Sequence, residues 1–556
     1  MLFDDNGHCE DIFAANPAFC AGPGGFRASG EGMSRVMDHV EKEAKSLGAV
    51  IHYETEAITV RQSENRNWIV QVRLRSGLSS QTFDKIVIAT GAFSRPAVPA
   101  FAVPFIQPFR TPVRPEEMKR RIAIHTSHLS DHTVQEALNC TRRHIVIVGA
   151  SKSALDASER FSSLGHSVTL VIRNPPYLAP PALLSAEGPK DAVAMVGTRE
   201  KAIGVPFPPD VVSGQSASGG LWARVYRWLV HSSWLSSRLH AQIISRSVAG
   251  FARWGRWADS ALRPMIPTVG LMWSEFSIFP GPEQFANLVH SGDIAIVKGA
   301  VVDMIESSTE GKEGFELVVQ GDNAEPIVLF ATSVIFGTGW STGEYPFFDD
   351  AESNRLGLPM PVKESRPERE EQYEQLDRSS MRTILNTLRT MRIMPSDWSL
   401  NGFAARFGPG KPPAWAPYRL FRLMVPLSSL YDRDIVFAGV PTCKANHVLF
   451  TCQAHWIADY FLDLLPHLPT LSVARREIST QTVWAQRLFG PSHGRLGQWL
   501  GAMWIEYCSR LCWDMGVQDD GKGWRGVVRS DSYDLDNKRR MRDEAIVREY
   551  SSEMRP

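Results

Sequence analysis

The sequence predicts an α/β fold, and one stretch near the middle of the chain carries most of this prediction. Residues 144–148, HIVIV, are a short β-branched run that is typical of a buried parallel strand. Residues 152–164 then show the apolar spacing of a helix, and Gly165 is a suitable end for it. Residues 168–172 form a second apolar strand. Together these segments predict a β-α-β unit of about 30 residues, the size of a dinucleotide half-domain.

Two segments in which a strand is followed by glycine stand on either side of this unit. A strand expected at 86–88 is followed by Thr90 and Gly91, and a strand expected at 334–336 is followed by Gly339. Glycine at the carboxyl end of a strand lets the backbone approach a bound cofactor closely. We therefore take Thr90, Gly91 and Gly339 as candidate cofactor-binding residues, although ordinary buried strands with turns would give the same pattern.

The turn inside the β-α-β unit departs from the dinucleotide motif GxGxxG at two positions. Its sequence is Gly149-Ala150-Ser151-Lys152-Ser153-Ala154. Gly149 suits the tight turn, Ser151 leaves less room beside a pyrophosphate, and Ala154 is small enough for close helix–strand packing. The amino end of the helix directs its N–H groups at the phosphates. All six residues are candidates, and the alternative is a structural strand–turn–helix.

A cation after the second strand favours a particular nucleotide. Arg173 lies where NAD-specific folds often place an acidic residue, and an arginine there suits the 2′-phosphate of NADP. Lys152 is the second candidate phosphate partner. With both strands and Arg173 in place, the nucleotide interpretation is favoured over the structural one.

The composition bounds the other functions. The 60 basic and 60 acidic residues cancel, so charge gives no argument for a nucleic-acid partner. The 556 residues predict more than one domain. Seven cysteines without a CxxC pair predict buried thiols in a reducing compartment and no metal site. The acidic start MLFDDNGHCE and the lack of a long apolar run predict a cytoplasmic protein without a signal peptide or spanning helix.

Taken in order, several motifs resemble those of the flavin-containing monooxygenases, a family of class B flavoprotein monooxygenases. The matching segments are IATG (88–91), IHTSHLSD (124–131), GASKSA (149–154), FGTGW (336–340) and QAHW (453–456). The resemblance covers roughly residues 30–470 and is closest to fungal members. It implies a nested flavoprotein architecture with two Rossmann-like dinucleotide-binding domains, which bind FAD and NADPH.

This resemblance sets the expected domain boundaries. Residues 1–115 correspond to a first FAD segment with a linking hairpin, and 116–345 to the NADP domain. Residues 346–470 correspond to the returning FAD segment, and 471–556 to a helical and charged tail. No strand–GxGxxG–helix is visible in residues 1–60, so the first FAD half-unit is expected to be incomplete.

The resemblance also implies the chemistry. NADPH reduces the flavin, O2 gives a C4a-peroxyflavin, and one oxygen atom passes to a small-molecule substrate. Oxygenation of nitrogen or sulfur and Baeyer–Villiger insertion stay open, as does a role in secondary metabolite biosynthesis. Because the flavin performs the difficult step, the sequence assigns no catalytic residue. Two alternatives are a truncated NADP-binding relative that does not hold FAD, and a disulfide reductase, which would need a redox cysteine pair beside the flavin.

Other elements follow from periodicity. We expect a helix at 33–47, a hairpin with strands at 50–60 and 68–74, a strand within 434–441 and a helix at 452–465 that ends before Pro466. His125 and His455 are more typical of structural than of catalytic histidines.

An insertion rich in tryptophan and arginine, at about 205–275, has two interpretations. It could lie on a membrane surface, or its helices could cover the NADP domain with arginine stems on aromatic faces. The balanced net charge favours the second. The charged chain from about 518 is expected to be a mobile tail or an exposed helix, and the oligomeric state is not predicted.

Overall fold

The computed structural model divides into two compact units, each described here by itself. Unit 1 comprises residues 1–91, 184–242 and 343–556, and unit 2 comprises 92–183 and 243–342. The domain boundaries expected from the sequence stay a prediction. The structure describes residues 38, 40–91, 95–106, 121–139, 142–173, 178–179, 233, 235, 238, 261–262, 277–278, 282–309, 312–321, 325–341, 343–361, 368–387, 415–443, 446–501 and 504–517.

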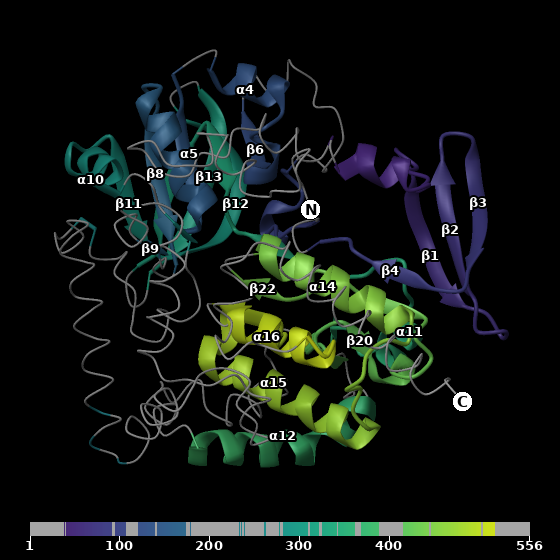
Figure 1. The fold of residues 1–556 in the computed structure, drawn as a ribbon. Helices are drawn as coiled ribbons and strands as arrows, with labels where there is room; N and C mark the ends of the chain where they lie inside the picture. Colours follow the sequence, from purple (N-terminus) through teal and green to yellow (C-terminus); the bar gives the residue numbers. More distant parts are fainter. Residues whose placement is uncertain are drawn as a thin grey trace, which may run out of the picture. The chain divides into compact units, whose positions relative to one another are not determined.

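Unit 2 is built on a five-stranded parallel sheet with the order β11-β8-β7-β15-β6 (Figure 1). Every neighbouring pair runs parallel. The strands are β6 (Ile122–His125), β7 (His144–Val148), β8 (Ser167–Ile172), β11 (Ile294–Lys298) and β15 (Ser333–Phe336). The strands predicted at 144–148, 168–172 and 334–336 are confirmed, and β8 and β15 each begin one residue earlier.

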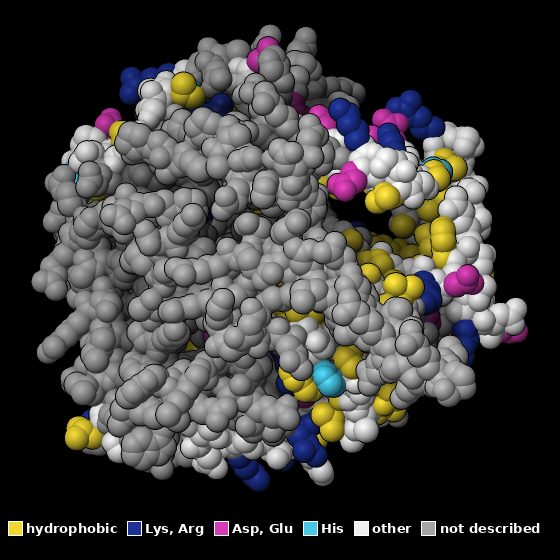
Figure 2. All heavy atoms as spheres, in the orientation of Figure 1, with side chains coloured by type: hydrophobic (Ala, Val, Ile, Leu, Met, Phe, Trp, Pro, Cys, Tyr) yellow, Lys and Arg dark blue, Asp and Glu magenta, His cyan; other side chains and the backbone are white. Residues whose placement is uncertain are grey.

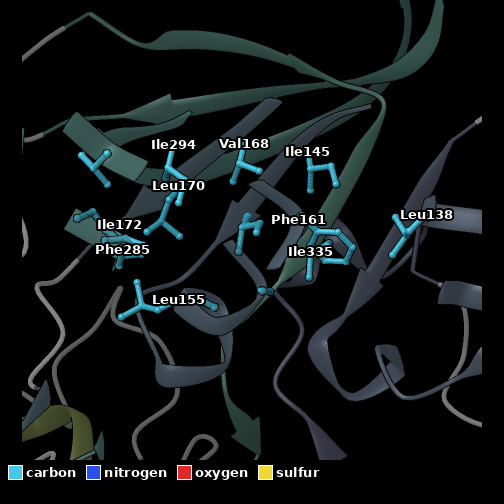
Figure 3. Packing of buried hydrophobic residues seen from close by; sticks show 14 of the residues in the cluster. Leu138, Ile145, Leu155, Phe161, Val168, Leu170, Ile172, Phe285, Ile294 and Ile335 are labelled. Carbon is cyan, nitrogen blue, oxygen red and sulfur yellow. The ribbon is translucent and has the colours of Figure 1, made fainter. Parts of the chain in front are cut away.

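Side chains alternate between the two faces of this sheet, and each face has its own apolar core. One core joins the sheet to helices α4 (His132–Asn139), α5 (Lys152–Ser163) and α10 (Pro282–His290), with Phe161 and Phe285 among its buried residues (Figure 3). The other core joins Val146, Val334 and Phe336 to a three-stranded antiparallel sheet. Its strands are β12 (Ala300–Thr309), β13 (Lys312–Gln320) and β14 (Ile327–Ala331). The parallel sheet is therefore covered on both sides, as its apolar sequence requires.

The helix of the predicted β-α-β unit is confirmed as α5. It begins at Lys152 and ends at Ser163, with Leu164 as the C-cap residue, and Gly165 then adopts a positive φ of 84°. Six of its residues are buried, at the spacing that places one face on the sheet. The sequence pattern thus located the start of this helix correctly and its end one residue too late.

Unit 1 contains a second, smaller parallel pair. Strand β4 (Ile86–Ile88) pairs with β21 (Ile435–Phe437), as expected from the strands predicted at 86–88 and within 434–441. The hairpin forecast was partly wrong. Strand β1 (Glu56–Gln62) begins six residues later than expected, because the chain turns at Tyr53 and Glu54 has a φ of 51°.

The hairpin is part of a three-stranded antiparallel sheet of order β1-β2-β3. Strand β2 (Trp68–Leu74) agrees with the prediction, but β3 (Gly77–Phe83) was not expected. Because β3 is almost entirely exposed, its sequence lacks the apolar alternation that marks a half-buried strand. Apolar side chains such as Leu47, Val50 and Leu78 are exposed in this part of unit 1, where Figure 2 shows yellow side chains at the surface.

Helices make up most of the remaining described part of unit 1. They are α11 (Asp350–Arg355), α12 (Glu368–Thr387), α14 (Asn446–Phe461), α15 (Leu471–His493) and α16 (Trp504–Asp514). The helix predicted at 452–465 is α14, but both of its ends were wrong. It ends at Phe461 because Asp463 takes a φ of 62° and the N–H of Leu464 returns to the Asp459 carbonyl. The other predicted helix, at 33–47, is described only at residues 38 and 40–46, which are helical.

Two buried arginines join these helices to the short strands β19 (Leu420–Phe421) and β20 (Val425–Pro426). Arg419 binds Glu370 and Asp377, both on α12. Arg422 binds Glu477 of α15 and Asp514 of α16. In each case one guanidinium satisfies two carboxylates that are themselves buried.

The remaining predictions have mixed outcomes. Cys452, Cys508 and Cys512 are buried thiols, as expected, and Cys443 is half-buried. In the described part of the chain, no helix has the length and apolarity needed to cross a membrane. The insertion at 205–275 lies almost wholly outside the described residues, and the tail from 518 lies entirely outside them.

Candidate nucleotide-binding site

The turn of the β-α-β unit follows β7 at the carboxyl edge of the five-stranded sheet. Strand β7 lies between β8 on one side and β15 on the other. From β7 the chain passes through α5 to β8 on one side, whereas β15 pairs with the other side of β7. This arrangement is a topological switch point, where open α/β sheets bind their ligands in a crevice outside the strand ends. The fold therefore places residues 149–154 where a nucleotide would bind.

Gly149 is required at this turn by both its conformation and its surroundings. Its φ of 127° is unfavourable for any residue with a side chain. A Cβ at this position would overlap with the carbonyl oxygen of Gly337 and lie 2.8 Å from the carbonyl carbon. The N–H of Gly149 donates to Val171 of β8 at 2.9 Å, and the N–H of Gly337 donates to Val148 of β7 at 2.8 Å. Sequence reasoning selected Gly339 and missed Gly337, although the segment FGTGW shows both.

The start of α5 leaves its first N–H groups without a side-chain cap. Ser151 has the extended conformation of an N-cap residue, but its hydroxyl donates instead to the Gly337 carbonyl at 3.1 Å. The uncapped amino end thus retains the donors and the positive dipole that attract a phosphate. Lys152 forms an ion pair with Asp156 one turn along the helix, and Ser153 is exposed. The half-buried Ala150 packs against the α5 core.

Arg173 is exposed directly after β8, two residues beyond the strand position that receives the Gly149 N–H. It shares the carboxyl edge of the sheet with the turn at 149–154. In the next strand, Lys298 of β11 pairs in register with Ile172, so a second cation ends a strand beside Arg173. Two basic residues thus end neighbouring strands next to the turn, and a cation at this place suits the 2′-phosphate of NADP.

The other candidates separate into two groups. Gly339 follows β15, has a φ of 83° and has no atom within 4 Å of a notional Cβ, so it is open to a ligand. Its carbonyl accepts the Ala97 N–H at 3.0 Å. Thr90 and Gly91 follow β4 and are exposed, but they belong to unit 1. The structure thus brings Gly149 to Ala154, Arg173 and Gly339 to one sheet edge and leaves Thr90 and Gly91 on a different sheet.

His125 ends strand β6 and is completely buried. Its Nδ1 accepts the N–H of Ser127 at 3.2 Å, and its ring meets the edge of Trp340 at 5.3 Å between centroids. Burial lowers the pKa of His125 to about 4, opposed by the Gly339 backbone and assisted by His128. His125 is therefore a neutral histidine that caps the turn after β6.

This pKa predicts a pH dependence of stability. Between about pH 6.5 and pH 4 the unfolded chain binds a proton that folded His125 excludes, so the free energy of unfolding falls as the pH falls. The full effect amounts to about 3 kcal/mol. An His125→Asn variant keeps an acceptor for the Ser127 N–H but does not titrate, so its denaturation midpoint should fall less steeply below pH 6.5.

Comparing the wild-type protein with His125→Asn separates the contribution of His125 from those of the other histidines whose pKa is lowered. Burial also lowers the pKa of His128, His144 and His166, and these remain in both proteins. An equal pH dependence of the midpoint in the wild-type protein and the variant would contradict the assignment.

The chain is similar in sequence to known FAD-dependent monooxygenases. A family model described as pyridine nucleotide-disulphide oxidoreductase matches residues 15–186. The FAD-dependent monooxygenase DEP4 of Fusarium langsethiae is 25% identical over 497 residues, which is 87% of this chain and 76% of that protein. The FAD-dependent monooxygenase rstn6 of Aspergillus nomiae is 23% identical over 463 residues, 79% and 70% of the two chains.

The chain is thus similar to FAD-dependent monooxygenases over most of its length. The family resemblance drawn from the five sequence motifs is thereby confirmed. A solved structure of cyclohexanone monooxygenase with bound ε-caprolactone aligns with this chain over 88% of the chain and 83% of that structure. With a TM-score of 0.45 and 13% identity, it is too distant to support any assignment of residues.

Proposed function

We propose that this chain is a flavin-dependent monooxygenase that uses FAD and NADPH to transfer one oxygen atom from O2 to a small organic substrate. The observation that carries the proposal is the carboxyl edge of the five-stranded sheet. There the Gly149 turn, the uncapped amino end of α5 and Arg173 occupy one topological switch point.

The described residues fit NADPH at this edge. Gly149 lets the backbone approach a pyrophosphate, and the first N–H groups of α5 can donate to its oxygens. Arg173 is exposed and able to bind the 2′-phosphate. Lys152 contributes positive charge at the start of α5 while it remains paired with Asp156.

The fit to FAD rests on the parallel pair in unit 1. Strands β4 and β21 end side by side, since Ile88 pairs in register with Phe437. Both continue into a glycine with positive φ, Gly91 at 72° and Gly439 at 75°. Gly91 has no atom within 4 Å of a notional Cβ, so a cofactor can approach its backbone. The described part of unit 1 holds no strand–GxGxxG–helix, so FAD is assigned through these two strand ends and through the family.

The cofactors would supply the redox chemistry, and the residues of the chain would bind and orient the cofactors. When bound, FAD would supply the chemistry that no side chain can, namely acceptance of a hydride from NADPH and activation of O2. The residues of this chain hold the nucleotide, orient it and exclude water. We place Thr90 and Gly91 near the FAD and residues 149–154, Arg173 and Gly339 near NADPH. The candidate reactions are oxygenation of nitrogen or sulfur and Baeyer–Villiger insertion. The candidate biological role is secondary metabolite biosynthesis.

Purified protein tests the proposal through its chromophore. We expect a yellow protein whose denaturation releases FAD, and NADPH oxidation that consumes O2. Colourless protein that still binds NADPH would contradict the proposal and favour a relative that does not hold FAD. Protein that binds neither molecule while remaining folded would refute the nucleotide assignment as well.

A further inference from the structure

The backbone conformation at position 337 does not require a glycine, yet Gly337 stands there. Gly337 does not have a positive φ, whereas Gly149 and Gly339 do. Its N–H continues the hydrogen bonding of the sheet to Val148 of β7. Another residue could adopt this conformation, so the reason for glycine must lie in the space around it.

That space is occupied by the start of α5. A Cβ on Gly337 would lie 2.6 Å from the Cβ of Ala154 and 3.1 Å from its Cα. Ala154 is completely buried, so it has no room to move away. Helix α5 and the end of β15 therefore approach at a distance that allows one methyl group between them and excludes two.

This contact involves the position at which the turn departs from GxGxxG. The third glycine of that motif permits close packing of helix against strand, and here that position holds Ala154. The second departure, Ser151, also contacts Gly337, because its hydroxyl donates to the Gly337 carbonyl at 3.1 Å. Both replaced residues of the motif thus contact one residue on the neighbouring strand, Gly337, which lies far from them in the sequence.

We propose that Gly337 is a positioning residue for NADPH. From the end of strand β15 it provides the space that the third glycine provides in proteins with the complete GxGxxG motif. Gly337 and Ala154 form a reciprocal pair in which one member must lack a methyl group. The pair sets how closely the amino end of α5 approaches the sheet edge, and so where its N–H groups meet the phosphates. This inference rests on the proposed function, since it assumes that the edge binds NADPH.

An exchange of the two residues tests the pair in the full-length chain. We expect Gly337→Ala to weaken NADPH binding at least about tenfold, measured by titration calorimetry. We expect Ala154→Gly to weaken NADPH binding less than Gly337→Ala does, because it removes a methyl group and creates no overlap. The double variant Ala154→Gly/Gly337→Ala should regain affinity to within about threefold of Ala154→Gly, since the Cβ–Cβ overlap is gone.

A matched control separates rescue from a general loosening of the helix. Ala157, one turn further along α5, is also buried, and Ala157→Gly lowers helix propensity equally. We expect Ala157→Gly/Gly337→Ala to show no recovery. Thermal unfolding of all variants is recorded in parallel, so that the recovery remains measurable even where Gly337→Ala alone folds poorly.

The outcomes distinguish this inference from the proposed function. Wild-type affinity in Gly337→Ala, or a double variant no better than Gly337→Ala, would overturn the pair. Equal recovery with the Ala157→Gly control would overturn it too. If the folded wild-type protein failed to bind NADPH, the proposed function would fall, whereas recovery of thermal stability in the double variant would still report on the packing of Gly337 against Ala154.

Discussion

The Arg419→Ala variant should lose about 3–5 kcal/mol of the free energy of unfolding, the largest loss that we expect from a single side chain. Arg419 is 2% exposed and donates to Glu370 at 2.6 and 3.1 Å and to Asp377 at 2.8 and 3.2 Å. Its removal leaves Asp377 buried without its cation and leaves Glu370 with Arg369 alone, at 3.3 Å. Asp377 keeps a hydrogen bond from Ser479, which compensates only a part of this loss.

Denaturant unfolding followed by tryptophan fluorescence measures the effect. Arg378→Ala is the matched control, because Arg378 lies on the same helix and pairs with Glu374 at the surface. An exposed pair of this kind contributes about 1 kcal/mol or less. Equal losses in the two variants would show that the buried cluster does not stabilise unit 1.

The sequence predicted those parts of the fold whose signals are local. Strands β7, β8 and β15 were recognised because buried parallel strands are short continuous apolar runs. Helix α5 was recognised from its apolar spacing and from Gly165 at its end. Strand β3 was missed because its side chains are exposed and polar, so nothing in its composition separates it from a loop.

The buried ion pairs were missed for a different reason. Arg419 and its partners Glu370 and Asp377 are 49 and 42 residues apart in the chain. An arginine or a glutamate within a sequence gives no sign of whether folding will bury it. Only the packing of α12 against the segment before β19 makes these charges interior, and that packing depends on the tertiary fold.

The candidate site shows the same division. The turn at Gly149 and the cation at Arg173 were found from their spacing along one β-α-β unit. Gly337 was not found, because its significance lies in a contact with Ala154 across two elements. Lys152 was predicted to bind phosphate, and its pairing with Asp156 could have been anticipated from the i, i+4 spacing in KSALD.

We expect Arg173→Ala to remove the preference for the phosphorylated nucleotide. One charge-assisted interaction with the 2′-phosphate contributes about 1.5–3 kcal/mol, so the Kd for NADPH should rise about 10- to 100-fold. The Kd for NADH should stay within about twofold, since NADH lacks that phosphate. Arg160→Ala serves as the control, because Arg160 is exposed in the last turn of α5, far along the helix from the phosphate end, and bonds Gln135.

The most direct measurement is therefore a calorimetric titration of the folded wild-type protein and of Arg173→Ala with NADPH and with NADH. The proposed site predicts saturable NADPH binding that is tighter than NADH binding in the wild-type protein, and similar affinities for the two nucleotides in the variant. Absence of NADPH binding to the wild-type protein, or a preference for NADPH that survives the loss of Arg173, would contradict the assignment of this sheet edge.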